Sequence, residues 1–441
     1  MERLAALVTR SLGAEGAGME AVESAVRAAM TRLGGSLLEG LLAADAGHRG
    51  PRVDCGAGHQ ARFIGYRDKT IHTVLGPIRL RRAYYHCTGC GHGVVLRDGE
   101  LGVAAGSTSP GLSRMLARAG ASVPFAKARD LIADLAGIEV GAKRVERVAE
   151  ATGTAIAERV EAETNAILAR TVVPLAPSPL PDKLYIAIDG TGVPMIRAAT
   201  AGRVGKHPDG RARTREVKLA ALFTQTTLDP EGRPVRKADS TSYLATFEPA
   251  AKFGRLALAE SRRRGADHIR QLVVLGDGAP WIWNQAGTRW PEATQIVDLF
   301  HAREHLHAIA ALLAESLGQD LHAWTDQRLA ELDAGDIEAL ITAARKPLPR
   351  DGKCVALDKA LPYFETNAHR MRYAHFRDLG MFVGSGVVEA GCKAVIGQRL
   401  KLSGMRWSLP GADGIIALRC AQTSNRWEPI CSSMHNQTAT A

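Results

Sequence analysis

Leu184-Tyr-Ile-Ala-Ile-Asp189-Gly-Thr-Gly192 is a short apolar run that ends in an acidic residue and a glycine-rich turn. Leu272-Val-Val-Leu-Gly-Asp277-Gly-Ala-Pro280 has the same arrangement. Apolar runs of this length, bounded by turn residues, are typical of buried strands. Val217–Thr224 and Thr294–Leu299 are two more such runs, and Phe247–Arg264 has the periodicity of a helix. Strands that alternate with helices predict an α/β domain.

Acidic residues lie at the carboxyl ends of these strands, where open α/β sheets bind their ligands. Asp189 and Asp277 are the two strand-end acids, and Glu389 lies near the start of a predicted helix. Carboxylate oxygens are the ligands that Mg²⁺ and Mn²⁺ prefer. Two such ions about 4 Å apart can activate a water or a 3′-hydroxyl in phosphoryl transfer. The residues therefore indicate a site for two Mg²⁺ or Mn²⁺ ions. The alternative is two Asp-Gly turns and a glutamate that only favours a helix dipole.

A change of composition marks the part of the chain before the α/β domain. Residues 1–47 have helical periodicity, and residues 48–105 are rich in Gly, Thr, aromatic and β-branched residues. Within the second segment, Lys69–Leu75 and Ile78–Tyr85 flank a Gly-Pro turn. We therefore predict N-terminal helices followed by a β-hairpin.

A cysteine pair follows this hairpin. Cys87-Thr-Gly-Cys90 is half of a zinc ribbon, with two thiolates on a tight turn after a strand. Cys55 and His59 supply the other half, and three Cys with one His form a valid tetrahedral site. We predict structural Zn²⁺ at these four residues. The alternatives are a fourth ligand from His86 or His92 and a metal-free hairpin.

Three short helical segments occupy residues 106–172: Gly111–Ala121, Ala126–Ala136 and Gly141–Ala151. Their spacing is typical of a helix-turn-helix unit, whose last helix faces the DNA groove. The basic residues on that helix are Lys143, Arg144 and Arg147. We predict that residues 106–172 bind DNA.

The rest of the chain divides by composition. A proline-rich linker at 173–182 precedes a catalytic domain at 183–427. Residues 301–383 are almost wholly helical in pattern, which indicates a helical insertion in that domain. A flexible tail is expected at 428–441.

Basic residues gather at two places in the catalytic domain, and we predict that they contact DNA phosphates. The first is a glycine-containing loop with Arg211, Arg213 and Arg215, for which a solvated loop is the alternative. The second group follows Glu389 on or after its helix and consists of Lys393, Arg399 and Arg406. Lys393 is one turn beyond Glu389, so it is placed to pair with that acid or to hold a phosphate.

Length, charge and cysteine usage limit the class of protein. At 441 residues the chain is expected to form two to four domains of about 150 residues each. It has 56 Lys and Arg against 46 Asp and Glu, a net charge of +10, which favours a polyanionic partner. No run approaches the ~20 apolar residues of a membrane span, and no signal sequence is evident. We expect a cytoplasmic, nucleoid-associated protein with reduced cysteines and no membrane partner.

Several stretches resemble the ISKra group of bacterial insertion-sequence transposases, and the resemblance extends from about residue 50 to 427. The stretches are Tyr185–Met195, Gly210–Lys218, Val274–Asn284, Gln295–His305, Ser385–Lys401 and Ser403–Trp407. The resemblance implies an RNase H-like core, a DDE triad and an all-helical insertion before the final Glu. It implies Asp189, Asp277 and Glu389 as the catalytic triad.

A fourth catalytic candidate is His301. Asp298-Leu-Phe-His301 is similar to the acid-x-x-His element of Mutator-like transposases. The resemblance implies that His301 contacts the scissile phosphate or orders the site. The alternative is a histidine that only caps the following helix or bonds within the core.

Together these features predict an α/β protein with an RNase H-like catalytic core and an all-helical insertion. A zinc-ribbon-like β-hairpin and a helix-turn-helix-like DNA-binding segment precede that core. The expected function is a DNA transposase that binds the ends of its element as a homo-oligomer and joins them to target duplex DNA. The alternatives are an inactive DNA-binding descendant of a transposase and a metal-dependent nuclease without strand transfer.

Overall fold

The computed structural model describes residues 18–205, 207–346 and 355–431, and the chain forms two compact units. Unit 1 contains Met1–Ile156 and Arg426–Ala441, and unit 2 contains Ala157–Asn425. The first part of the predicted N-terminal helices and most of the predicted tail lie outside the described residues. In the part of the chain that is described, no helix is both long enough and apolar enough to cross a membrane.

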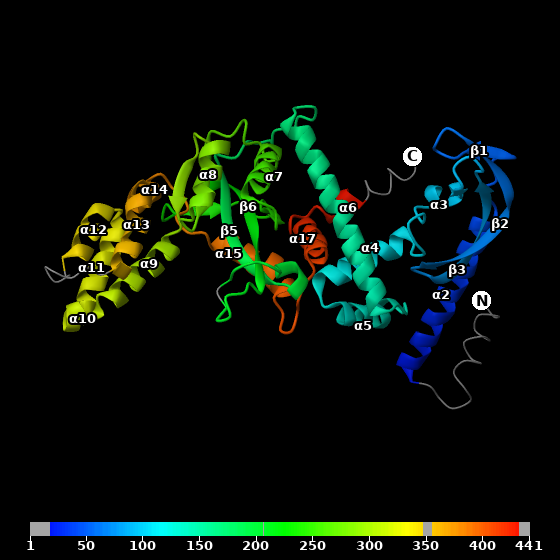
Figure 1. The fold of residues 1–441 in the computed structure, drawn as a ribbon, viewed down its shortest axis with the longest axis horizontal. Helices are drawn as coiled ribbons and strands as arrows, with labels where there is room; N and C mark the ends of the chain where they lie inside the picture. Colours follow the sequence, from blue (N-terminus) through cyan, green and yellow to red (C-terminus); the bar gives the residue numbers. More distant parts are fainter. Residues whose placement is uncertain (1–17, 206, 347–354, 432–441) are drawn as a thin grey trace. The chain divides into compact units, whose positions relative to one another are not determined.

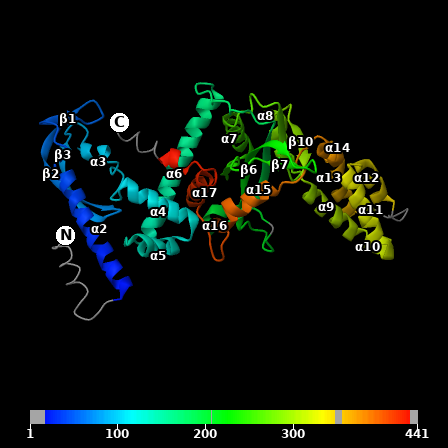
Figure 2. The ribbon, with the colours of Figure 1, turned by 180° about the vertical axis from the view of Figure 1, so that it is seen from behind.

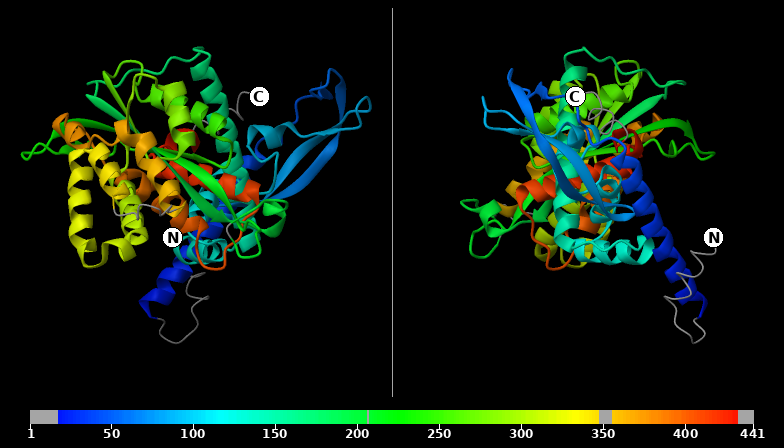
Figure 3. Two further views of the ribbon diagram at one scale, coloured as in Figure 1. Left: turned by 60° about the vertical axis from the view of Figure 1, so that its left-hand side comes forward. Right: turned by 90° about the vertical axis from the view of Figure 1, so that its right-hand side faces the viewer.

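Unit 1 contains an antiparallel sheet with the strand order β1-β2-β3-β4. The strands are β1 (Arg52–Asp54), β2 (Gln60–Thr73), β3 (Gly76–His86) and β4 (Gly93–Val94). β2 and β3 form a long twisted hairpin, with helix α2 (Met19–Ala43) packed on β3 (Figure 3). The predicted hairpin is present, but β2 begins well before Lys69, because its ladder with β3 continues past a bulge between Phe63 and Gly65. The short helix α3 (Leu96–Glu100) follows β4.

Three helices follow, at the positions that the periodicity predicts: α4 (Pro110–Ser122), α5 (Phe125–Ala136) and α6 (Ala142–Leu168). Their shared core includes Leu112, Leu116, Ile132 and Val145. Gly137 ends α5 in the left-handed conformation, with φ of 68°, which suits glycine at a helix C-terminus. α6 is 27 residues long, and the boundary between the two units falls within it. The predicted linker at 173–182 carries neither helix nor strand.

Unit 2 is a mixed α/β domain built on a six-stranded sheet (Figure 1). Its main path is β10-β9-β5-β6-β7, and β8 also pairs with β6. β10, β9 and β5 are parallel neighbours, whereas β6 is antiparallel to β5, β7 and β8. The strands are β5 (Lys183–Pro194), β6 (Thr214–Leu228), β7 (Pro234–Arg236), β8 (Ser242–Thr246), β9 (Gln271–Gly276) and β10 (Thr294–Val297).

Helices cover both faces of this sheet. α7 (Ala250–Arg263) and α8 (Pro280–Arg289) pack together on one face, and α15 (Gly386–Gly391) crosses the other (Figures 1 and 2). After α15 the helix continues through the π-helical segment η4 (Cys392–Gly397) into α16 (Gln398–Leu400). α17 (Leu409–Thr423) packs against β8.

A helical segment lies between β10 and α15, as the sequence predicts. It forms its own cluster at one end of unit 2 (Figure 1). Its helices are α9 (Leu299–Leu312), α10 (Ala314–Leu317), α11 (Leu321–Ala334), α12 (Ile337–Arg345), α13 (Val355–Asn367) and α14 (Tyr373–Asp378).

Candidate functional sites

The register of the parallel strands aligns three acids at one edge of the sheet. The ladder between β5 and β9 ends two residues before Asp189 and Asp277, so these two residues are opposite each other. The ladder between β9 and β10 ends one residue before Asp277 and Asp298. Neighbouring strands are about 4.8 Å apart. Three carboxyl groups therefore occupy adjacent positions, in the order Asp189, Asp277 and Asp298.

Asp189 is half-buried and is held by two hydrogen bonds. Its Oδ1 accepts from the Gly190 N–H at 2.6 Å, and its Oδ2 accepts from the Cys392 thiol at 3.2 Å. Burial raises the pKa of the Asp189 carboxyl, these bonds lower it, and the neighbouring charge of Asp277 raises it again, for a net increase. A carboxylate that is buried beside a second carboxylate is stabilised by a cation. Cys392, which sequence reasoning did not single out, is thus part of this site.

Asp277 connects the sheet edge to the helical segment. Its Oδ1 accepts from the Ala279 N–H at 2.9 Å, which fixes the turn after β9. The Tyr363 hydroxyl, on α13, donates to the Asp277 carbonyl at 3.0 Å. Gly278 has φ of +101°, and a Cβ at that position would lie 2.5 Å from the Tyr363 ring. The ring of Tyr363 also stacks on His305 of α9, with centroids 3.7 Å apart. The turn that carries Asp277 therefore needs glycine, and the helical segment packs directly on it.

Glu389 reaches the site from α15, which packs against β5 and β6. A Cβ on Gly391 would lie 2.6 Å from the ring of Tyr243, so glycine allows this close approach. The Ser385 hydroxyl donates to Glu389 Oε1 at 3.3 Å. Cys392 begins the π-helical segment η4, and such segments often occur at functional sites. The helix thus brings Glu389 and Cys392 to the face of the sheet that carries Asp189.

Asp298 and His301 connect the start of α9 to the segment before α15. Asp298 is fully buried and caps α9, because its Oδ1 accepts from the His301 N–H at 2.8 Å and contacts His301 Nδ1 at 3.2 Å. Its Oδ2 accepts from the Ser385 N–H. Burial opposes ionisation of Asp298, but these bonds outweigh it and lower its pKa. They also raise the pKa of His301 to about 9. The backbone N–H of His301 therefore takes part in the helix cap, as the alternative interpretation expected, and its ring contacts the same Asp298 carboxylate.

The donor atoms suit a divalent cation. Ligand atoms of Asp298, His301 and Glu389 all lie within 4.8 Å of one another. Asp298 accepts N–H donors on both oxygens, and Asp189 likewise accepts a hydrogen bond on each of its oxygens, so either residue would exchange a hydrogen bond for a metal ion. Asp277 Oδ2 and Glu389 Oε2 have no hydrogen-bond partner among the described residues. A pair of ions about 4 Å apart spreads its ligands beyond such a compact group. Of the predicted triad, only Glu389 belongs to the compact group that can bind a metal ion, and Asp189 and Asp277 lie outside that group.

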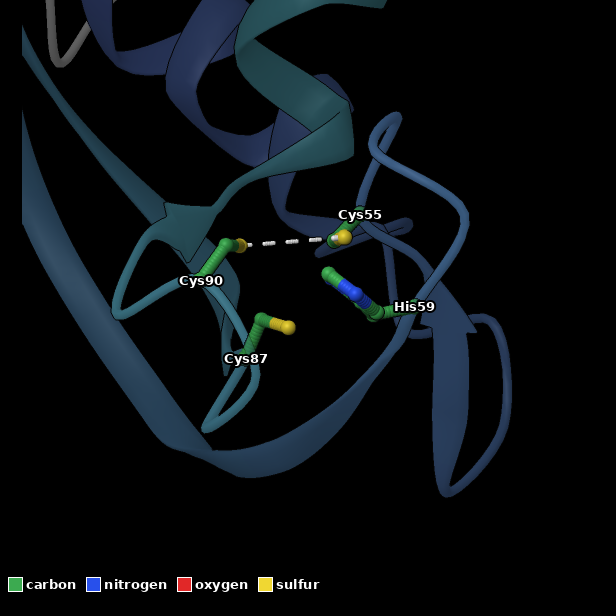
Figure 4. Close-up of side chains that lie close together, drawn as sticks. All are labelled: Cys55, His59, Cys87 and Cys90. Atoms are coloured by element: carbon green, nitrogen blue, oxygen red, sulfur yellow. Dashed lines mark hydrogen bonds between the residues drawn. The ribbon is translucent and has the colours of Figure 1, made fainter.

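Unit 1 contains a second candidate metal site, formed by Cys55, His59, Cys87 and Cys90 (Figure 4). One ligand atom from each of the four lies within 4.8 Å of the others, and Cys55 Sγ is 3.8 Å from Cys90 Sγ. The backbone N–H of Cys90 lowers the pKa of the Cys87 thiol, which favours the thiolate that zinc binds. This group can bind zinc, and His59, rather than His86 or His92, supplies its histidine.

Two loops hold the site together. The N–H of Cys55 donates to the His59 carbonyl at 3.0 Å, and the N–H of Cys87 donates to the His92 carbonyl at 2.9 Å. The second pair lies in the turn between β3 and β4, where His92 contributes its backbone carbonyl and Cys87 and Cys90 contribute their thiols. Each half of the site is therefore closed by its own backbone hydrogen bond.

The predicted DNA-contacting residues of unit 1 lie in the first turns of α6. Lys143 and Arg147 are exposed, and Lys143 pairs with Glu146 at 2.7 Å. Arg144 is half-buried, and its charge adds to burial in lowering the pKa of His72. Two of the three basic side chains are thus accessible from solvent.

Among the DNA contacts predicted in unit 2, the one at Arg399 is wrong and the others stay predictions. Arg399 has no exposed surface, because its guanidinium lies 4.9 Å from the centre of the Trp407 ring inside the unit, so it cannot touch DNA in this conformation. Lys393 is exposed and forms no ion pair with Glu389. The other predicted contacts, Arg211, Arg213, Arg215 and Arg406, are exposed or half-exposed.

Comparisons with known proteins found no matching protein-family model and no matching curated protein. The interpretation of both sites therefore depends on their geometry and on the chemistry of their residues.

Proposed function

We propose that this protein is a DDE transposase of the ISKra type with an RNase H-like catalytic core. The strand arrangement of unit 2 supports the fold. An antiparallel series β5-β6-β8 is followed by α7, β9, α8 and β10, with β9 and β10 parallel to β5. This is the order of an RNase H-like sheet, and the helical segment before α15 has the position of the insertion in DDE transposases. The observation that carries the proposal is the matching register of Asp189 and Asp277, with α15 bringing Glu389 to the same face.

Asp189, Asp277 and Glu389 are the residues that would hold two Mg²⁺ or Mn²⁺ ions, which would supply Lewis acidity and activate the nucleophile. Asp189 lies within β5 and Asp277 directly follows β9, so the ladder between these two strands fixes the backbone positions of both residues. Asp298 orients His301 towards the same edge, and the raised pKa of His301 keeps its ring cationic at neutral pH. A cationic imidazole beside the acids can bind the scissile phosphate. The three acids would act as metal ligands and His301 as a positive charge, and none of the acids would transfer a proton.

DNA is the proposed partner. The net charge of +10 favours phosphate binding. The α4–α6 unit and the zinc-ribbon-like hairpin are proposed to recognise the element's ends as double-stranded DNA. Joining two ends to one target requires two catalytic cores, so a homo-oligomer on DNA is proposed.

The test is cleavage and joining of duplex DNA that carries the element's own ends, with Mg²⁺ or Mn²⁺, by wild type and Asp277→Asn. We expect metal-dependent joined products from wild type. We expect a loss of at least about a hundredfold in the variant, because even loss of a residue that only orients a metal ligand costs about 10–100-fold and Asp277 is a proposed ligand itself. The matched control is Asp326→Asn, an equivalent change at an exposed position of α11.

Each contrary outcome has a different meaning. Tight binding of the ends without cleavage in either metal would favour an inactive DNA-binding descendant of a transposase. Cleavage without joining would favour a nuclease. Cleavage that survives Asp277→Asn would show that the active site lies elsewhere.

A further inference from the structure

A cavity of about 880 Å³ lies in unit 2 at the C-terminal end of β5. Its walls come from the end of β5, the 3₁₀ helix η1 (Arg197–Thr200), the loop that leads into β6, and the segment Gly404 to Arg406. The apolar part of its lining includes Pro194, Met195 and Met405. The cavity therefore combines an apolar floor with walls from separate parts of the chain.

Arginines surround this floor. Five of them line the cavity, against a single acid, Asp209: they are Arg197, Arg203, Arg211, Arg213 and Arg406. Asp209 accepts hydrogen bonds from the Arg211 N–H at 3.0 Å and from His207 at 2.9 Å, and its other oxygen lies 3.5 Å from the Arg213 guanidinium. The other four arginines form no ion pair with any described carboxylate. All five are exposed, so the rim is a cluster of available positive charge.

Two of the segments that line the cavity follow candidate catalytic acids in the chain. Pro194 is five residues beyond Asp189 on β5, which is about 17 Å along a strand. Trp407 follows the helix that carries Glu389 and joins the β5 end, since its N–H donates to the Pro194 carbonyl at 3.1 Å and its carbonyl accepts from the Ile196 N–H at 2.9 Å. Nucleotides in one DNA strand are about 3.4 Å apart. The cavity is thus within about five nucleotides of a phosphate at the acids.

We propose that this cavity holds one unpaired nucleotide of the DNA substrate. This rests on the proposed function. A hollow of this volume is the size of a pocket for a single small group, and a base that is paired and stacked in a duplex cannot enter such a pocket unless it leaves the stack. The arginine rim fits a phosphate, and guanidinium planes also stack on bases. Pro194, Met195 and Met405 give the base an apolar floor. An unpaired nucleotide is the part of DNA that offers both chemistries at once.

The test measures affinity for two short duplexes of the same sequence, one perfectly paired and one with a single unpaired thymidine, without added Mg²⁺ or Mn²⁺. We expect wild type to bind the second about tenfold more tightly, equivalent to about 1.4 kcal/mol. Ala201→Trp fills the cavity from an exposed position of its lining. It should remove the preference and keep the affinity for paired DNA.

Two further variants separate charge from shape. Arg203→Ala should weaken binding of the unpaired form more than that of the paired form, because it removes one rim charge that is not paired with Asp209. Arg270→Ala is the matched control, since Arg270 is exposed at the opposite end of β9 from Asp277. It should leave the preference unchanged. Circular dichroism confirms that each variant is folded.

Equal affinity of wild type for both duplexes would overturn the inference, as would a preference that survives Ala201→Trp. These failures leave acid-dependent cleavage of the element's ends unaffected. Failure of the proposed function is distinct, because it would be seen as loss of cleavage in every metal while the preference for unpaired DNA remains.

Discussion

The fully buried carboxylate of Asp298 is the structural connection between α9 and the segment before α15, and replacing it with asparagine tests that role. In Asp298→Asn one acceptor oxygen becomes an NH₂ group, so either the His301 N–H or the Ser385 N–H faces a donor. Loss of one charge-assisted hydrogen bond costs about 1.5–3 kcal/mol, and an unsatisfied buried donor adds about 1–3 kcal/mol. We expect the free energy of unfolding to fall by about 3–5 kcal/mol.

The assay is urea unfolding followed by tryptophan fluorescence, in which unit 2 dominates the signal because it contains Trp281, Trp283, Trp290, Trp324 and Trp407. The variant should lower the transition midpoint with an unchanged slope. Asp336→Asn is the control, because Asp336 also caps a helix but is exposed and accepts only the Ala339 N–H at 3.2 Å. The unfolding free energy of Asp336→Asn should fall by less than about 1 kcal/mol, since Asp and Asn are both good N-cap residues. Equal losses in the two variants would refute the connecting role of Asp298.

Two other measurements test parts of the structure away from this network. Wild type purified with zinc should hold about one zinc ion per chain, and Cys90→Ser should hold no zinc. Cys420→Ser is the control, because Cys420 lies outside the cluster, and it should keep the ion. Wild type that binds no zinc would contradict the site. Burial raises the pKa of Asp413 to about 6, above its usual 3.8, so the folded state binds the proton more tightly and stability falls as pH rises from about 4 to 6. As pH falls from about 7 to 4, wild type should gain about 2 kcal/mol of unfolding free energy relative to Asp413→Asn, after allowance for partial exposure; parallel pH profiles of the two proteins would exclude a contribution from Asp413.

The position of Asp277 could be predicted because it directly follows the apolar strand β9. Asp189 was also expected to end its strand, but β5 continues to Pro194 because its ladder with β6 extends that far, so that prediction was wrong. The role of Asp298 was not foreseen, although Asp298-Leu-Phe-His301 was noted, because its partner Ser385 is 87 residues further along the chain. Cys392 was missed for the same reason, since its contact with Asp189 depends on how α15 crosses the sheet.

The error over Arg399 has a different origin. A basic residue on a short helix is usually solvated, and nothing local shows that Trp407 folds back over it. The extent of α6 was also underestimated, because residues beyond Ala151 have polar faces that resemble the end of a helix until their contacts are known. Arg263 and Glu163 make one such contact, at 2.9 Å. Local pattern thus predicted the type of each of these elements, whereas their full extent and what covers them depend on contacts between distant residues.

The matched register of β5 and β9 limits how this protein can change during evolution. Successive side chains of a strand point to opposite faces, so inserting or deleting one residue within β9 would turn Asp277 away from Asp189. Substitutions that keep an apolar side chain leave the alignment intact. Descendants of this chain can therefore vary widely in β9 sequence, but active ones must keep the number of residues between the start of that strand and Asp277.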